Sequence, residues 1–234
     1  MLKVLLWDID GTLLDFKAAE RAVVPLLFER FGLGECTEEM LRTYSKINEE
    51  QWARLERGED TKRNILVGRF RELFERYGLD VSAAPAFNDA YQPMLGEFVF
   101  PIPGAIETVR EFKVRGIPQY AVTNGTKKAQ SGKLKVSGLD KLFDGIFISE
   151  EVGYEKPDQR FFDHVLTAIG PVDRKEVLII GDSLTSDMAG GCAAGILTCR
   201  FDPKGHVNDT ALPIDFTVRT IPDVIGLAER LAAE

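Results

Sequence analysis

The chain has 234 residues, more than one small domain needs and fewer than two full-sized domains take, so we expect a main domain with a smaller insert. Hydrophobic residues make up 44% and charged residues 28% of the chain, which excludes a largely disordered protein. The net charge of −8 disfavours partners such as nucleic-acid polymers and anionic membranes. The 3 cysteines have no close pairing, which fits a reducing compartment, and we expect a cytoplasmic protein without a disulfide framework or a zinc cluster.

The first expected element is a buried strand in the apolar run 3–9, which ends at Asp8 and Asp10. These two acids interrupt the run before a signal sequence or a membrane span is complete, so we expect neither. From residue 16 to about 97 the periodicity is helical, and the pattern is broken by glycines near residues 32–34, 58 and 78. The stripe expected on the first of these helices is Ala19, Ala22, Val23, Leu26, Leu27 and Phe31.

After Pro101 apolar runs of strand length alternate with helical patterns, as in a parallel sheet with helical crossovers. The expected strands are 119–122, 145–149, 177–180, 197–200 and 216–218. The expected helices are 105–113, 127–137, 159–169, 187–194 and 224–232. The sequence therefore predicts an α/β core made of residues 1–14 and 101–234, interrupted by an all-helical domain of residues 15–100.

Polar groups follow four of the predicted strands, and the carboxyl ends of parallel strands form one edge where ligands bind. The four sets are Asp8 with Asp10, Thr123-Asn124-Gly125, Lys156, and Asp182 with Asp187. Four converging carboxylates repel one another unless a cation lies among them, even with one lysine nearby. Oxygen ligands with positions left for water and a phosphate suit Mg²⁺.

These four sets, in this order and at these strand ends, resemble the motifs of the haloacid dehalogenase-like (HAD) hydrolase superfamily over nearly the whole chain. The resemblance implies a Rossmann-like parallel-sheet core with the inserted helical cap of the family's first subclass. It also implies that Asp8 is a nucleophile that forms an aspartyl-phosphate, and that Asp10 protonates the leaving oxygen and then activates water. Lys156 matches the residue that neutralises the charge of the nucleophile and the phosphoryl group.

The remaining motif residues match the family's phosphate and metal ligands. Thr123 and Asn124, with Gly125 beside them, match the motif that holds the phosphate. Asp182 and Asp187 match the acids that hold Mg²⁺ together with Asp8 and the backbone carbonyl of Asp10. Dehalogenase members lack an Asp at the place of Asp10, so its presence favours phosphoester chemistry.

A narrower resemblance is to the pyrimidine 5′-nucleotidase branch of the capped HAD phosphatases. It rests on residues 44–48, Trp52, Gly58, 68–70 and 148–153. That branch often has an acid where this chain has Gly11. Within the cap, Asn48 could bind a base edge or form a hydrogen bond inside the cap, and Trp52 could contact the substrate or pack. The pair Gly132-Lys133 lacks the rest of a phosphate-binding P-loop, and we assign it no such role.

Together these patterns predict a Mg²⁺-dependent phosphatase of small phosphorylated metabolites, most of all pyrimidine nucleoside 5′-monophosphates. The alternatives are a sugar-phosphate or phosphoglycolate-type phosphatase, and a phosphoglucomutase-like enzyme. A non-catalytic metabolite-binding protein that keeps the fold is the alternative from another class. We expect a monomer or a small homo-oligomer.

Overall fold

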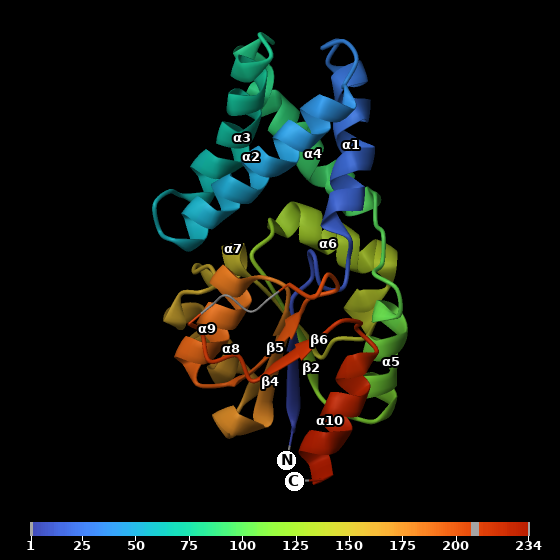
Figure 1. Ribbon diagram of the computed structural model, residues 1–234, viewed down its shortest axis with the longest axis vertical. Helices are drawn as coiled ribbons and strands as arrows, with labels where there is room; N and C mark the ends of the chain where they lie inside the picture. The colour runs from blue at the N-terminus through green and yellow to red at the C-terminus, as the bar shows by residue number, and fades with distance from the viewer. Residues whose placement is uncertain (1, 207–210, 234) are drawn as a thin grey trace.

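The computed structural model describes residues 2–206 and 211–233, which form a parallel sheet flanked by helices with a second, all-helical layer above its edge (Figure 1). The six strands lie in the order β3-β2-β1-β4-β5-β6. They are β1 (Val4–Trp7), β2 (Gln119–Thr123), β3 (Gly145–Ile148), β4 (Val177–Gly181), β5 (Leu197–Phe201) and β6 (Phe216–Val218). The predicted class, a Rossmann-like α/β core with an inserted helical cap, is confirmed.

Strand β1 is central because all four of its residues are buried and it pairs in parallel with both β2 and β4. Its side chains alternate between the two faces of the sheet. Leu5 and Trp7 belong to the apolar cluster under α5 (Ala105–Val114) and α10 (Asp223–Ala233). Val4 and Leu6 belong to the cluster under α8 (Gln159–Ile169) and α9 (Ala189–Ala194). In chain order, β2 and β3 follow on one side of β1, and β4, β5 and β6 then follow on the other side. The carboxyl ends of β1, β2 and β4 therefore surround the point where the strand order reverses, which is where such sheets bind ligands.

The core helices mostly agree with the predicted ranges. They are α5 (Ala105–Val114), α6 (Lys127–Ser137), α7 (Ser149–Val152), α8 (Gln159–Ile169), α9 (Ala189–Ala194) and α10 (Asp223–Ala233). Two of them differ from the sequence prediction. The short helix α7 was not predicted, because its first residue was assigned to the preceding strand, and a π-helical turn (Leu184–Met188) precedes α9, where a helix was expected from Asp187. The Ser183 hydroxyl caps this turn by accepting from the backbone of Ser186, so the chain coils earlier than its apolar pattern indicates.

Four long helices form the cap: α1 (Phe16–Arg30), α2 (Glu38–Glu56), α3 (Lys62–Arg76) and α4 (Ala84–Glu97). The side chains of Asp15, Thr37 and Thr61 cap the first three. The cap has its own apolar core, which is rich in aromatic rings: Phe28, Tyr44, Phe70, Phe74, Phe87 and Tyr91. The expected stripe of α1 was wrong in part. Leu26 is 41% exposed and Phe28 is buried instead. The buried face of α1 therefore also includes Glu20 and Val24.

The two chain segments that join cap and core run side by side. The backbone N–H of Asp15 donates to the carbonyl of Phe100 (2.7 Å), and that of Ile102 donates to Leu13 (2.9 Å). The division into residues 1–14 with 101–234 and residues 15–100 stays a prediction. Within residues 2–206 and 211–233, no helix is long and apolar enough to cross a membrane.

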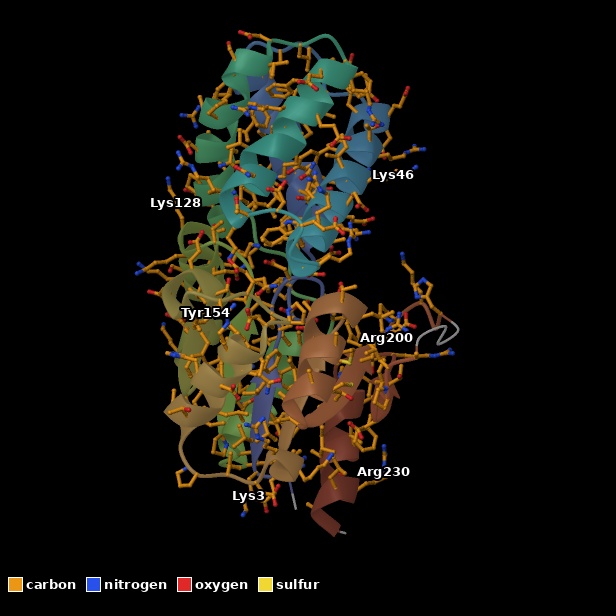
Figure 2. The ribbon with its side chains drawn as sticks, turned by 90° about the vertical axis from the view of Figure 1, so that its left-hand side faces the viewer. Lys3, Lys46, Lys128, Tyr154, Arg200 and Arg230 are labelled. Atoms are coloured by element: carbon orange, nitrogen blue, oxygen red, sulfur yellow. The ribbon has the colours of Figure 1, made fainter. Side chains whose placement is uncertain are left out.

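The cap lies over the edge of the sheet that carries the predicted site. In Figure 2, Lys46 of α2 lies on the cap, and Lys3, just before β1, lies at the opposite end of the molecule. The amino ends of the parallel strands therefore point away from the cap and their carboxyl ends point toward it.

Candidate active site

Asp8 lies at the carboxyl end of the central strand, where its side chain is 10% exposed. Its backbone N–H donates to the carbonyl of Ile180 on β4 (2.9 Å), so the sheet fixes its position. The chain then turns at Gly11, whose φ of +92° favours glycine, and a Cβ there would lie 2.6 Å from Asp182 Oδ2. A side chain at this place would therefore require Asp182 to shift.

Lys156 forms ion pairs with two acids that follow different strands. Its ammonium group donates to Asp8 Oδ1 (2.7 Å), to Asp187 Oδ1 (2.6 Å) and to the backbone carbonyl of Val122 (2.7 Å). The side chain is 1% exposed. Burial would lower the pKa of Lys156, but the charges of Asp187 and Asp8 outweigh it and raise the pKa, so the amine is protonated.

The loop after β2 positions the lysine. The side-chain amide of Asn124 donates to the backbone carbonyl of Lys156 and accepts from its backbone N–H, both at 2.8 Å. The hydroxyl of Thr123 accepts from the backbone N–H of Gly125 (3.1 Å). A Cβ at Gly125 would lie 2.0 Å from Gln130 Nε2, so the loop and the start of α6 are packed too closely for any side chain there. The phosphate-binding role of these three residues stays a prediction.

Three acids form a group that could hold a metal ion, because ligand oxygens of Asp8, Asp182 and Asp187 lie within 4.8 Å of one another. Asp8 and Asp187 are buried, whereas Asp182 is open to solvent. The Thr12 hydroxyl donates to Asp182 Oδ1 (3.2 Å) and the Ser183 backbone donates to Asp187 Oδ2 (3.2 Å). The group offers only hard oxygen donors with one open side, which fits Mg²⁺.

The electrostatics of the group also fit a divalent cation. Burial raises the pKa of Asp8, and the charge of Asp187 raises it further against the opposing effect of Lys156. Although Asp182 has a solvent-exposed side, loss of hydration at its carboxyl group raises its pKa, and the charge of Asp8 adds to the effect. Burial raises the pKa of Asp187, with the charge of Asp182 adding to it. With all groups ionised, three carboxylates and one ammonium leave two negative charges. A divalent cation would neutralise them and stabilise the ionised carboxylates.

Asp10 is half-buried and both of its carboxylate oxygens accept hydrogen bonds from α6. Lys133 Nζ donates to Oδ1 and Gln130 Nε2 donates to Oδ2, each at 2.5 Å. Sequence reasoning missed both residues. The available signal was that Gln130 and Lys133 share the apolar stripe of α6 with Ala129 and Leu134, a position where long polar side chains need buried partners.

Two cap residues that were also missed contact core loops that carry predicted site residues. Glu56, in the last turn of α2, accepts a hydrogen bond from the hydroxyl of Thr185, which lies between Asp182 and Asp187. Lys62, the first residue of α3, donates to the Ser149 hydroxyl (2.5 Å) and pairs with Glu155 (3.3 Å), the residue before Lys156. The cap therefore contacts both loops that supply Lys156, Asp182 and Asp187.

The predicted cap residues lie on α2. The amide of Asn48 is 4% exposed, accepts from Arg69 (2.7 Å) and donates to Glu20 (3.4 Å). Of the two roles open for Asn48, these contacts favour the hydrogen bond inside the cap. Trp52 is half-buried one turn further along. Contact of either residue with a substrate stays a prediction.

The fold and the site define a capped α/β protein of the hydrolase type, with carboxylates and one lysine clustered at the edge of its sheet. Residues 2–195 match the family model of the haloacid dehalogenase-like hydrolases. The chain is 34% identical over 222 residues to the HAD-hydrolase YfnB of Bacillus subtilis, with 95% of this chain and 93% of YfnB covered. It is 32% identical to the pyrimidine 5′-nucleotidase PynA of Streptococcus pneumoniae, with 97% and 95% covered. It is 34% identical to the pyrimidine 5′-nucleotidase YjjG of Escherichia coli, with 80% and 82% covered.

The solved structure of YfnB, which is bound to magnesium, superposes with a TM-score of 0.91 at 33% identity and covers 97% of this chain and 98% of that chain. L-2-haloacid dehalogenase of Xanthobacter autotrophicus shares the fold, with a TM-score of 0.74 at 19% identity and 98% and 99% covered. The chain belongs to the haloacid dehalogenase-like hydrolase family. It is an enzyme of that family's phosphoric monoester hydrolase type, as the four motifs predict.

Proposed function

We propose that this protein is a Mg²⁺-dependent 5′-nucleotidase that hydrolyses pyrimidine nucleoside 5′-monophosphates. The observation that carries the proposal is the carboxylate of Asp8, buried at the switch point of the sheet and held by Lys156 next to two further acids. The two pyrimidine 5′-nucleotidases among the relatives support the substrate class. Relatives named glyceraldehyde 3-phosphate phosphatase, at 27% identity, support a sugar-phosphate substrate as the second candidate.

The reaction begins when an oxygen of Asp8 attacks phosphorus and the bond to the nucleoside oxygen breaks. Asp10 gives its proton to that leaving oxygen. Lys156 stays protonated beside Asp8 and offsets negative charge as the phosphoryl group transfers. Asp10 then takes a proton from water, whose oxygen attacks phosphorus and releases phosphate and free Asp8.

Asp8, Asp182 and Asp187, with the backbone carbonyl of Asp10, would hold Mg²⁺. When bound, the ion supplies positive charge that offsets repulsion between the nucleophile and the phosphate. Thr123, Asn124 and Gly125 would hold the phosphate from the neighbouring strand end. The group attached to the phosphate would then face the cap, with α2 above the catalytic loops.

The test is a comparison of kcat/KM for UMP, dUMP, dTMP, AMP, GMP, glyceraldehyde 3-phosphate and a hexose phosphate, with Mg²⁺ and with a chelator. We expect the pyrimidine nucleotides to exceed AMP and GMP, because a pocket fitted to one ring rejects the bulk of a second ring. Equal values, or a preference for the sugar phosphates, would refute the nucleotidase assignment and leave the phosphatase chemistry intact. Inertness on the whole panel would favour the metabolite-binding alternative.

A further inference from the structure

Two polar side chains that do not belong to the acid cluster bind Asp10. Lys133 and Gln130 lie three residues apart on α6, so their side chains project from the same face of the helix, one turn apart. Each donates to a different oxygen of the Asp10 carboxylate at 2.5 Å. The pair therefore restrains both the position and the rotation of that carboxylate.

Burying the ammonium group of Lys133 costs free energy unless the group has a polar partner. The side chain of Lys133 is 3% exposed, whereas Lys128, on the same helix, is solvent-exposed (Figure 2). Polar partners offset the cost of burying an ammonium group to this degree, and the Asp10 carboxyl group is the partner that Lys133 contacts. The other donor is also fixed, because Gln130 packs directly against Gly125 of the phosphate loop.

We propose that Lys133 is a positioning residue for the acid/base group of the reaction, and that Gln130 assists it. By binding both oxygens of Asp10, the two side chains hold this carboxyl group in the orientation needed for proton transfer to the leaving oxygen and from water. This inference rests on the proposed phosphatase function, in which Asp10 transfers those protons.

The same lysine contacts the cap. Its ammonium group lies 5.0 Å from the ring centroid of Phe16, the first residue of α1, directly after the segment that joins core to cap. Lys133 thus links the orientation of Asp10 to the position of the first cap helix. The acid/base group is held firmly when the cap lies where this structure has it.

The experiment compares Lys133→Met with wild type and with Lys128→Met as the matched exposed control. Two substrates are used: UMP, whose alkoxide leaving group needs a proton, and p-nitrophenyl phosphate, whose leaving group needs none. The parameter is kcat/KM, which reports the steps up to phosphoenzyme formation. We expect Lys133→Met to lower the value for UMP by about 10- to 100-fold and that for p-nitrophenyl phosphate by less than about threefold. Lys128→Met should leave both values unchanged.

A double variant separates positioning from general damage. If Lys133 acts through Asp10, then Asp10→Asn with Lys133→Met should be no slower on UMP than Asp10→Asn alone. Gln130→Met should shift the UMP to p-nitrophenyl phosphate ratio in the same direction, and it replaces Lys133→Met as the test if that variant does not fold. An equal loss on both substrates, or fully additive losses in the double variant, would overturn the inference. A wild-type enzyme that releases no phosphate from either substrate would instead overturn the proposed function and the inference with it.

Discussion

Glu20 is a carboxyl group buried between the first two cap helices, and replacing it with Gln should change the pH dependence of stability. It is 2% exposed and accepts a hydrogen bond from the amide of Asn48 (3.4 Å). Burial raises its pKa from the ordinary 4.5 to about 7, against the opposing effects of Ser45 and Arg69. The folded protein therefore holds a proton on Glu20 that the unfolded chain has already lost between these two pH values.

The sign of the effect follows from that difference. Because the folded state binds the extra proton, its free energy of unfolding falls as pH rises from 4.5 to about 7. At about 1.4 kcal/mol per pH unit, the loss amounts to at most about 3.5 kcal/mol above pH 7. Gln resembles the protonated carboxyl group at every pH. Glu20→Gln should thus equal wild type near pH 4.5 and be more stable than wild type at pH 8.

Urea unfolding at pH 5 and pH 8 measures this, with Glu29→Gln on the exposed side of α1 as the matched control. The active-site acids titrate in all three proteins, so the difference between variants isolates Glu20. A stability difference between Glu20→Gln and wild type that is the same at both pH values would refute the reasoning. So would a variant that is less stable than wild type at pH 8.

Three further results are expected. Asp8→Asn should lower phosphate release by at least about a thousandfold with an unchanged circular dichroism spectrum, because an amide does not attack phosphorus; turnover close to that of the wild type would remove Asp8 from the nucleophile role. A chelator should abolish activity, and Mg²⁺ should restore it and raise Tm by a few degrees, since a bound cation relieves repulsion among the acids; a metal-independent Tm would contradict the metal site. Lys62→Met should lower kcat/KM for UMP by severalfold through loss of the cap contacts to Ser149 and Glu155, whereas exposed Arg63→Met should not; equal values for the two variants would show that the contact has no role.

The sheet and the four motifs could be predicted because each depends on local pattern. Short apolar runs bounded by turn residues mark the buried parallel strands, and the residue after each run must lie at the carboxyl edge. Asp8, Lys156 and Asp187 meet there, as the order of the motifs predicts.

The residues that sequence reasoning missed depend on tertiary contacts. Lys133 could not be placed, because no local pattern tells which strand end the polar part of α6 faces. Glu20 interrupts an apolar stripe yet is buried, since partners from α2 and α3 cover it. Leu26 was misplaced for the same reason, because the packing of the four cap helices decides which face of α1 is covered.

The cap and the core also meet where two glycines face each other, and this contact constrains how the two parts can move. A Cβ on Gly132 of α6 would lie 2.7 Å from the Cα of Gly96 on α4, so these two helices touch backbone to backbone. A joint this close allows rotation but little sliding. The linkers, paired between Asp15 and Phe100, lie just before α1 and just after α4, the helix that carries Gly96. A cap that rotates about this joint would separate from the core first at the end of α2 and the start of α3. The opening for substrate and product would then lie on the side away from α6.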